Sequence, residues 1–518
     1  MLFNSYIFIF IFLPSTIIGF FVIASTGRKQ LALAYLVVAS MIFYAWWNPI
    51  YIILILLSII FNYMMGMEIG RDTTKFSAKR ILVLGIFANL LLLAYYKYAN
   101  FFVDNLNFLV NTGMHIDNII LPIGISFFTF TQIAFLIDAY RGETHEYNFF
   151  HYCLFVTFYP HLLAGPIVHH KELIPQFSKK CIYSLNCRFL SIGLTVFAMG
   201  LFKKVVIADT VAIYSTPVFA AAAKGSLITF LEAWSAALAY TFQIYFDFSG
   251  YSDMAIGLSY MFGIKLPFNF HSPYKATNIV EFWRSWHMTL SRFLRDYLYI
   301  PLGGNRKGKI RRYVNLFITM LLGGLWHGAG WTFVLWGALH GFYLIVNHAW
   351  GEVKSRLGLT ASSPSWTWPA KLLTFLAVVF AWVFFRADNF STAIVFLKGM
   401  CGLNGIYLPV GYLHKLGFLG KFLSYSGVKF IEPKFYFGLP VFFLLFILLL
   451  VVWLIPNTQQ ILFKNKIGLE IHHKLEVSAF WRRFAWSPNT CWAIIIFVIS
   501  IISIVMISDT NEFLYFQF

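Results

Sequence analysis

Residues 50–67 read IYIILILLSIIFNYMMGM, eighteen consecutive residues without a charged side chain. A helix needs about 20 mostly apolar residues to cross the hydrocarbon core of a bilayer. Similar runs recur along the whole chain. The main candidates for spans are 6–24, 31–47, 50–67, 81–96, 119–138, 228–247, 331–349, 371–385, 435–455 and 490–508, and further apolar stretches that could be partial spans lie at 148–167, 190–211 and 313–328. We therefore predict an all-α polytopic membrane protein with about 10–13 membrane helices, some of them partial or re-entrant.

The composition excludes a soluble protein of this size. Hydrophobic residues make up 59% of the chain and charged residues 12%, whereas soluble domains carry roughly 45–50% and about 25%. The net charge of +18 is explained by basic residues in cytoplasmic loops, so no nucleic acid partner is implied. Five cysteines without paired spacing indicate neither a metal site nor a disulfide framework.

Charge placement gives an orientation. No basic residue precedes the run 6–24, so we interpret it as a retained span rather than a cleaved signal peptide. Arg28 and Lys29 follow the first run, and a second basic group begins at Arg71 after the third. Because basic loops stay inside, the N-terminus is expected to face outward.

One histidine lies in an apolar run between glycines. Leu321 to Gly330 reads LLGGLWHGAG and contains His327. Glycine lets another backbone or a ligand come close, and an ionisable residue at membrane depth is a functional candidate. The alternative is a structural histidine that hydrogen-bonds a neighbouring helix.

A second constellation runs from Glu281 to Tyr297 as EFWRSWHMTLSRFLRDY. As a single helix it would stack Trp283 over His287 and would form two ion pairs, Glu281–Arg284 and Arg292–Asp296. Interleaved tryptophans and charges suit an amphipathic helix in the membrane interface. A plain interfacial anchor accounts for the tryptophans and arginines, but it accounts poorly for His287.

A third constellation, Gln243 to Asp253, places two carboxylates at the end of a predicted span. Asp247 and Asp253, with hydroxyls between them, could shape a polar cavity. The alternative is a helix end, with Asp253 near the N-terminus of the next helix, where negative charge is favoured.

The most basic stretch is 265–312, with ten Lys and Arg against Glu281 and Asp296. Its loop Gly303 to Lys309, GGNRKGK, lacks the spacing of a Walker phosphate loop. Positive-inside bias alone could place these charges in the cytoplasm.

Taken together, the motifs resemble the membrane-bound O-acyltransferase family, in its bacterial polysaccharide branch. The matching segments are LPIGIS from Leu121, YPHLLAGP from Tyr159, GLFKK from Gly200, Tyr245 to Asp253, Glu281 to Asn305 and Gly323 to Ala329. The opening Met1 to Pro14 and the aromatic end Phe513 to Phe518 also resemble the family's sequences. Ser285 stands where the common form has a second arginine, a departure that we expect to be tolerated.

The resemblance implies a fold and roles for named residues. The fold is a ring of tilted helices around a funnel, with membrane helices 1–118, a catalytic core 119–350 and further membrane helices 351–518 in a single integrated membrane domain. His327 corresponds to the family's catalytic histidine and His287 to its second active-site residue. We expect the acyl donor to contact Arg306, Lys307, Lys309, Trp283, Arg284 and Asp247.

The implied reaction takes an acetyl group from a cytoplasmic thioester, most simply acetyl-CoA, and passes it across a bacterial inner membrane. The acceptor is an extracytoplasmic polysaccharide such as alginate or peptidoglycan, reached through a separate periplasmic or extracellular esterase-like transferase. No permanently bound cofactor or metal is expected. A general base must remove the proton of the acceptor hydroxyl, and a buried imidazole suits that task.

Two alternatives stay open. Within the family, the chain could be a D-alanyl transferase for teichoic acids, although such members are typically shorter. From another class, it could be a transporter or flippase of a lipid-linked sugar. Transporters usually carry paired repeats with broken helices, and no internal repeat is evident here.

Overall fold

The computed structural model describes residues 1–71, 74–144, 148–358, 366–432, 434–435, 438–469, 477–508 and 513–514. Over these ranges the regular structure is almost entirely helical, as predicted. The strands found there are β1 (Tyr407–Leu408) and β2 (Lys429–Phe430), which pair in parallel with Tyr407 opposite Lys429. Of the C-terminal segment quoted above, residues 515–518 lie outside the described residues.

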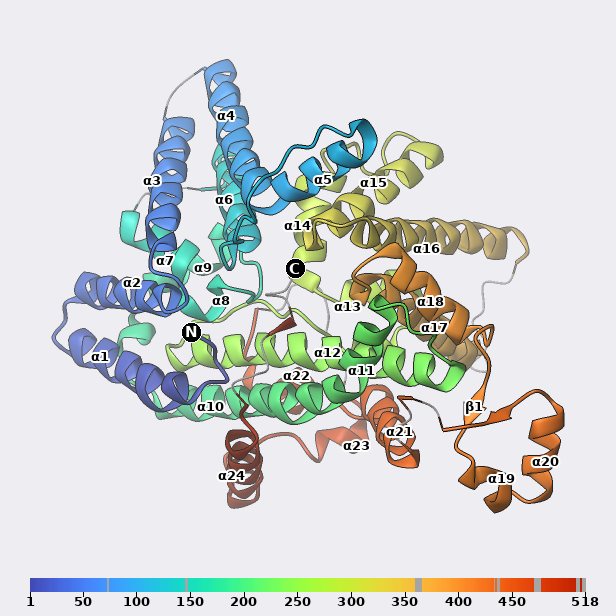
Figure 1. Cartoon of the computed structure of the whole chain (residues 1–518). Helices are drawn as coiled ribbons and strands as arrows, with labels where there is room; N and C mark the ends of the chain where they lie inside the picture. Colours follow the sequence, from blue (N-terminus) through green and yellow to red (C-terminus); the bar gives the residue numbers. More distant parts are fainter. Residues whose placement is uncertain are drawn as a thin grey trace.

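The helices follow one another through short connections (Figure 1). The N-terminal third contains η1 (Phe8–Phe12), α1 (Leu13–Ser25), α2 (Lys29–Ala45), α3 (Tyr51–Gly70), α4 (Lys75–Leu93), η2 (Ala94–Tyr98), α5 (Ala99–Val110), α6 (Ile125–Tyr140), α7 (Phe149–Thr157), α8 (Tyr159–Leu162), α9 (His170–Phe177) and η3 (Lys180–Tyr183). The middle contains α10 (Cys187–Leu201), η4 (Phe202–Ala208), α11 (Asp209–Ala223), α12 (Phe230–Met261), η5 (Pro273–Lys275), α13 (Ile279–Ser285), α14 (Met288–Leu294), η6 (Arg295–Tyr299), α15 (Lys309–His327) and α16 (Trp331–Arg356). The remainder contains α17 (Thr367–Arg386), α18 (Phe390–Met400), α19 (Gly411–Lys415), α20 (Phe418–Tyr425), α21 (Leu439–Leu454), α22 (Thr458–Ile461), η8 (Phe463–Asn465), α23 (Ala479–Arg482) and α24 (Thr490–Val505).

Five helical segments of the described chain are long and apolar enough to cross a membrane: Phe8–Ser25, Tyr51–Gly70, Lys75–Val110, Cys187–Ala223 and Thr367–Arg386. Shorter apolar helices accompany them, among them α2, α6, α18, α21 and α24. The further apolar stretch 148–167 folds as α7 and α8, of 9 and 4 residues, which are too short to span a bilayer. The prediction of a polytopic membrane protein with partial segments is therefore confirmed.

The predicted end of a span at residue 247 is wrong. Helix α12 continues through it as 32 residues, and its residues are buried almost throughout. It crosses the middle of the molecule with α10 and α11 beside it (Figure 1). Asp247 and Asp253 therefore lie inside one central helix, where neighbouring helices rather than solvent satisfy their carboxylates.

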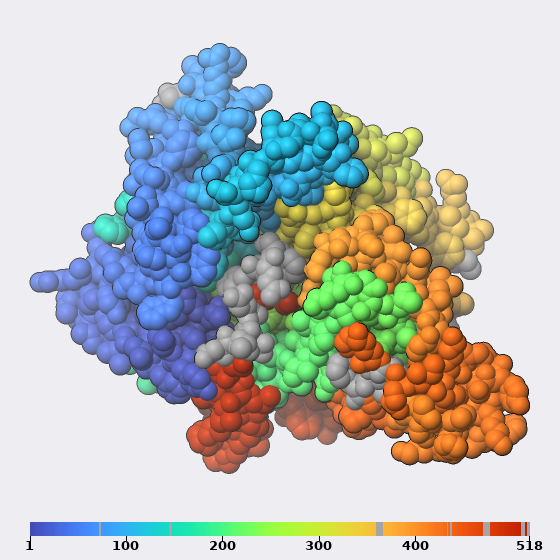
Figure 2. Space-filling view, viewed as in Figure 1, coloured from blue at the N-terminus to red at the C-terminus, as the bar shows by residue number. Residues whose placement is uncertain are grey.

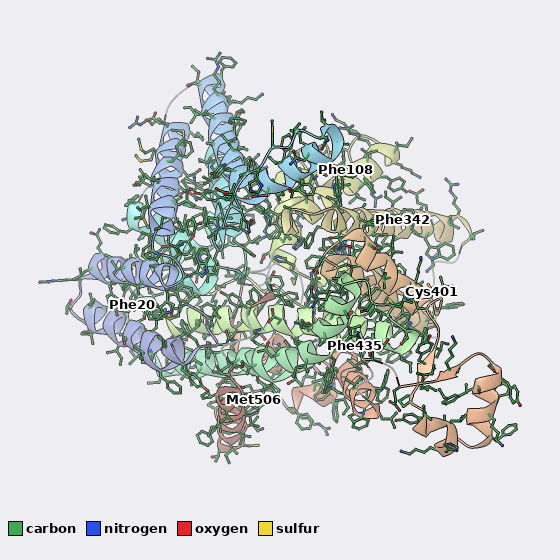
Figure 3. All side chains as sticks on the ribbon, viewed as in Figure 1. Phe20, Phe108, Phe342, Cys401, Phe435 and Met506 are labelled. Carbon is green, nitrogen blue, oxygen red and sulfur yellow. The ribbon has the colours of Figure 1, made fainter. Side chains whose placement is uncertain are left out.

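Large apolar side chains cover the outside of the helices. Phe108 on α5 and Phe342 on α16 lie on the periphery (Figure 3), with exposed fractions of 88% and 56%. Phe20, labelled in the same view, is fully buried between helices. Water would penalise such a surface, whereas lipid tails match it. Figure 2 also shows the segment of α19 and α20, in orange, standing out from the helices around it.

Glycines let two central helices approach each other closely. Gly193 and Gly200 on α10 face Gly257 and Gly250 on α12, and a Cβ added at Gly250 would lie 2.7 Å from the carbonyl oxygen of Gly200. Packing of small residues is a main source of helix association where lipid weakens the hydrophobic effect. The α10–α12 contact therefore depends on the absence of side chains at these positions.

We predict that Gly250→Ala lowers the apparent Tm of the detergent-solubilised protein, because the helix backbones must move apart at a cost of about 1–3 kcal/mol. The matched control is Gly351→Ala on α16, where an added Cβ meets nothing within 4 Å. That variant should keep or raise the Tm, since alanine favours a helix over glycine. Equal Tm values for the two variants would contradict the assignment of a close helix contact.

Candidate active site

His327 is the last residue of α15. The helix stops there because Gly328 and Gly330 adopt extended backbone before α16 begins. The imidazole is buried against aromatic rings, edge-on to Trp336 at 5.1 Å and to Phe385 at 5.2 Å between ring centroids. The side chain predicted to be catalytic therefore lies in an aromatic enclosure formed by α15, α16 and α17.

The glycines around His327 admit a neighbouring helix. A Cβ added at Gly324 would lie 2.3 Å from the carbonyl oxygen of Phe333, and one at Gly337 would lie 2.4 Å from the carbonyl oxygen of Met320. The sequence suggested that these glycines admit either another backbone or a ligand. At Gly324 the neighbour is another backbone, that of α16. The α15–α16 hairpin is consequently tight at the end that carries His327.

His287 lies in a break between α13 and α14. Its backbone is left-handed, with φ of +42°, which is rare for a residue with a side chain. The break arises because segment 269–271 takes the backbone groups beside it: the N–H of Met288 donates to the carbonyl of Asn269, and the N–H of His271 donates to that of Ser285. Such outliers concentrate at functional sites, where surrounding contacts hold them.

Asn269 also fixes the His287 ring. Nδ1 of His287 lies 2.9 Å from Oδ1 of Asn269, which accepts a further hydrogen bond from Oγ1 of Thr289 at 2.9 Å. An amide oxygen only accepts, so Nδ1 carries the proton and the lone pair of the neutral ring lies on Nε2. The side chain of His287 is fully buried.

The two histidines predicted from the sequence lie together. Their ring centroids are 6.5 Å apart, and Trp326 contacts both rings, at 5.0 Å from His327 and 6.2 Å from His287. The two residues are distant in the chain. They meet because the break between α13 and α14, which holds His287, lies beside the end of α15, which holds His327.

The interfacial helix predicted for Glu281 to Tyr297 is wrong. Trp283 on α13 and Trp286 just after it are buried in the core, with exposed fractions of 9% and 1%, rather than on a lipid-facing surface. The break at His287 prevents the predicted stacking of Trp283 over it, and Nε1 of Trp283 instead donates to Nδ1 of His340 at 3.2 Å. Arg284 on the same helix is exposed.

The predicted ion pairs of that segment also form differently. Glu281 accepts from the backbone N–H of Thr277 at 2.9 Å. Arg292 makes a two-point contact with the carboxylate of Glu172 on α9, and Asp296 pairs with its neighbour Arg295. Both members of each predicted pair lie on the same side of the break, so the pairs give way to other partners rather than to the break: Thr277 for Glu281 and Glu172 for Arg292.

Asp247 belongs to a buried ion-pair cluster. Its Oδ1 lies 2.8 Å from Nζ of Lys204, which also binds Asp209 at 2.8 Å. Its Oδ2 accepts a hydrogen bond from the backbone N–H of Leu514 at 3.1 Å, so the C-terminal segment reaches this helix. Asp253 pairs in the same way with Lys203, at 2.6 Å.

The basic loop lies at the far end of α15 from His327. Arg306 and Lys307 are exposed in the turn before the helix, and Lys309, its first residue, pairs with Glu352 of α16 at 2.9 Å. At 1.5 Å per residue this end is about 27 Å from His327 along the helix axis. The structure therefore does not gather all predicted donor-binding residues in one place.

A small pocket opens beside His327. It is lined by Lys97, Leu121, Pro122, Ile123, Gly124, Ile125, Ser126, Phe127, Leu163, Trp326 and His327. The sequence motifs LPIGIS and YPHLLAGP both contribute to this wall. Gly124 has a φ of +76°, and an added Cβ there would lie 3.1 Å from the carbonyl oxygen of Leu162, so glycine suits the turn on both counts.

Two residues of the site were missed by the sequence reasoning. His340 on α16 is fully buried, with its ring centroid 4.8 Å from that of Trp336. Lys97 reaches the carbonyl oxygens at the end of α15. Both are ionisable residues in or beside an apolar run, the same signal that identified His327. Over the described ranges, no group of three or more His, Cys, Asp or Glu could hold a metal ion.

Comparison with known proteins shows which family the chain belongs to. The family model described as MBOAT, membrane-bound O-acyltransferase family, matches residues 31–387. The chain is 41% identical over 493 residues to the peptidoglycan O-acetyltransferase of Helicobacter pylori, a match covering 90% of this chain and 92% of that protein. It is 45% identical over 400 residues to the probable alginate O-acetylase AlgI of Pseudomonas aeruginosa, covering 76% and 73%.

A further relative is similar over a shorter stretch. The teichoic acid D-alanyltransferase of Streptococcus thermophilus is 30% identical over 244 residues, or 45% of this chain and 59% of that protein. The segment matched by the family model contains both buried histidines and Lys97. The chain therefore belongs to the membrane-bound O-acyltransferase family and is a multi-pass membrane O-acetyltransferase.

Proposed function

We propose that this protein takes an acetyl group from a cytoplasmic thioester, most simply acetyl-CoA, and passes it across the membrane for O-acetylation of an extracytoplasmic polysaccharide. The observation that carries the proposal is the pair of buried imidazoles, His287 and His327, with ring centroids 6.5 Å apart beside a pocket. The relatives named for peptidoglycan and alginate support a polymer of this kind.

The two ends of α15 give the reaction a direction. Its start is basic, as are the start of α4 at Lys75 and the end of α6, where Arg141 donates to the carbonyl of Asp296 in the segment that leads into α15. Basic ends favour the cytoplasm. His327 and the pocket lie at the opposite end of α15, so donor and acceptor reach the imidazole from opposite sides.

His327 is proposed as the general base. The imidazole takes the proton of the acceptor hydroxyl as its oxygen attacks the thioester carbonyl, and the proton then passes to the departing thiolate. The aromatic enclosure keeps water away from the thioester, which limits hydrolysis. A variant of the scheme, in which the imidazole carries the acetyl group briefly, uses the same residue.

His287 is proposed to orient the reacting groups. With Nδ1 hydrogen-bonded to Asn269, the neutral ring accepts at Nε2 and offers a donor there only when protonated. This favours a role in orientation over stabilisation of charge on the thioester oxygen.

Donor capture is proposed for the exposed charges of the basic loop. Arg306 and Lys307 are available to the nucleotide phosphates, whereas Lys309 is partly neutralised by Glu352. Arg284 is also exposed and stays a candidate. For Trp283 and Asp247 an indirect effect through His340 and Lys204 fits their contacts better than touching the donor.

We propose that the catalytic core is 119–350, within the single membrane domain. It contains both histidines, but Lys97 from the N-terminal segment and Phe385 from the C-terminal segment complete the site. The core is accordingly not an independent unit.

We place the protein in a bacterial inner membrane, acting with a separate periplasmic or extracellular esterase-like transferase. A polysaccharide requires an extended recognition surface, and the chain between the apolar helices is short. Teichoic acid D-alanylation is the second candidate, and the shorter match to that relative makes it the weaker one. Transfer of radiolabelled acetyl from acetyl-CoA to the polymer in membranes, with and without the gene, separates acetylation from both D-alanylation and sugar transport.

We predict that His327→Ala abolishes acetyl transfer while the protein stays in the membrane at a normal level, because the variant lacks the proposed base. Labelled polymer and an immunoblot of the membranes measure the two quantities. The matched control is His115→Ala, in an exposed loop. Substantial transfer by the His327 variant would remove this residue from the base role.

We predict that His287→Ala impairs transfer less completely, because water can partly replace an orienting group. Asn269→Ala should reproduce part of the defect, since it frees the His287 ring to adopt the other tautomer. Steady-state kinetics with a varied donor concentration provide the test. Normal donor affinity and normal turnover in His287→Ala would reduce this residue to a structural role.

We predict that neutralising Arg306, Lys307 and Lys309 to Gln raises the donor KM several-fold with little change in kcat, and that the effect fades at high salt. Long-range attraction of this kind is shared among charges and screened by ions. Arg306 and Lys307 should account for most of the change.

The control neutralises Lys75 and Lys79 at the start of α4, which removes charge from the same side. Both proteins are also scored for topology, since lost basic charge can misorient a span. A correctly inserted triple variant with the wild-type KM at low salt would leave the loop as a topological anchor.

A further inference from the structure

Lys97 is a cation placed against the catalytic end of α15. Its Nζ donates to the carbonyl oxygen of Trp326 at 2.6 Å, to that of His327 at 3.1 Å and to Oγ of Ser126 at 3.3 Å. All three acceptors are neutral, and within the described part of the chain no carboxylate lies within 4.0 Å of Nζ. A charge kept in an apolar span without an ionic partner is costly, which makes a functional reason the default expectation.

The acceptors of Lys97 are groups that the helix itself cannot satisfy. The last four carbonyls of an α-helix have no partner within the helix, and α15 ends at His327 with extended backbone after it. Tyr98, which follows Lys97 in the chain, donates its hydroxyl hydrogen to the carbonyl of Leu325 at 2.8 Å. Two adjacent side chains thus hold three successive carbonyls, and the positive charge also lies where the helix dipole favours a cation.

The local backbone presents Lys97 in an unusual way. Residues Ala94–Tyr98 form a π-helical turn between α4 and α5. Such turns occur often at functional sites, where the extra residue per turn redirects side chains. Lys97 also lines the pocket beside His327. The cation therefore lies at the junction between the end of α15 and the space where the acceptor is proposed to bind.

We propose that Lys97 is a positioning residue for acyl transfer, which holds the last turn of α15 and thereby sets the direction of the His327 imidazole toward the pocket. The proposal rests on the proposed function of His327 as the base. A hydrogen bond to the backbone of His327 itself restrains the peptide unit from which the imidazole projects. A shift of about 1 Å in a reacting group can cost about 100-fold in rate.

Kinetics of Lys97→Met separate positioning from donor binding. The variant keeps an unbranched side chain that is only one atom shorter and removes the amine. We expect kcat to fall by about 10- to 100-fold with the donor KM within about twofold of wild type, because the lost contact acts on the chemical step. The matched control is Lys79→Met, on the basic end of α4, which should keep wild-type kcat. Wild-type kcat in Lys97→Met overturns the proposal.

Chemical rescue separates positioning from a general effect on folding. Lys97→Cys is prepared with Cys181, Cys187, Cys401 and Cys491, which are exposed, replaced by Ser. Alkylation with 2-bromoethylamine restores an ammonium group at the lysine position, whereas 1-bromopropane adds a neutral chain of equal length. We expect the amine alone to restore most of kcat. Equal recovery by both adducts, or recovery by neither, assigns Lys97 to packing and overturns the proposal.

A second readout does not depend on acetyl transfer. Diethyl pyrocarbonate modifies imidazoles, and mass spectrometry of the peptide that contains His327 gives its rate. In Lys97→Met the rate should rise several-fold, because the loosened turn exposes the ring, and aminoethylation of Lys97→Cys should reverse the rise. If the wild-type protein transfers no acetyl group, the proposed function fails, and this rate alone decides the role of Lys97: an unchanged rate overturns it.

Discussion

The arrangement of the helices depends on ion pairs that form inside the protein, because a bilayer supplies no water to buried charged groups. Lys204 binds Asp209 and Asp247, Lys203 binds Asp253, and Arg292 binds Glu172. Apart from the local Lys204–Asp209 contact, these pairs join helices that are distant in the chain, so the groups that cost most to bury also fix how the helices are arranged. Removing one partner would leave a charge unpaired in a low-dielectric interior, which is strongly destabilising. The intact pair adds little net stability, because the cost of desolvating both groups offsets their attraction, so its main effect is on how the helices are arranged.

The same constraint explains how a reactive centre can exist inside the membrane. Polar backbone is tolerated there only where protein covers it. The break at His287 is covered by segment 269–271, and the end of α15 is covered by the turn Ala94–Tyr98. Each of these contacts binds backbone groups that a continuous helix would bind itself, so the helix can be interrupted at its histidine. The chemistry therefore lies at the interruptions of the helices, while the continuous helix α12 carries the scaffold.

Much of the fold and part of the site followed from the sequence, for physical reasons that differ by region. Apolar runs such as 50–67 predict spans because lipid imposes the pattern locally, and His327 was conspicuous as an ionisable group among glycines. The full length of α12 was missed because Asp247 and Asp253 resemble a helix end, and the lysines that satisfy them lie about 40–50 residues earlier in the chain. The segment at 281–297 fits one regular helix until Asn269 and His271 take its backbone groups. Lys97 was missed because its acceptors lie 229 and 230 residues away.

That separation along the chain has a consequence for biogenesis. Translation delivers the turn Ala94–Tyr98 to the insertion machinery long before it delivers α15. During that interval the ammonium group of Lys97 has none of its carbonyl acceptors from Trp326 and His327, and an apolar environment would be costly for it. The early helices must therefore wait with this group at a hydrated surface, and α4 can settle at its final depth only after the α15–α16 hairpin arrives. A chain truncated before α15 therefore leaves the Lys97 amine without these carbonyl acceptors, next to a long apolar helix.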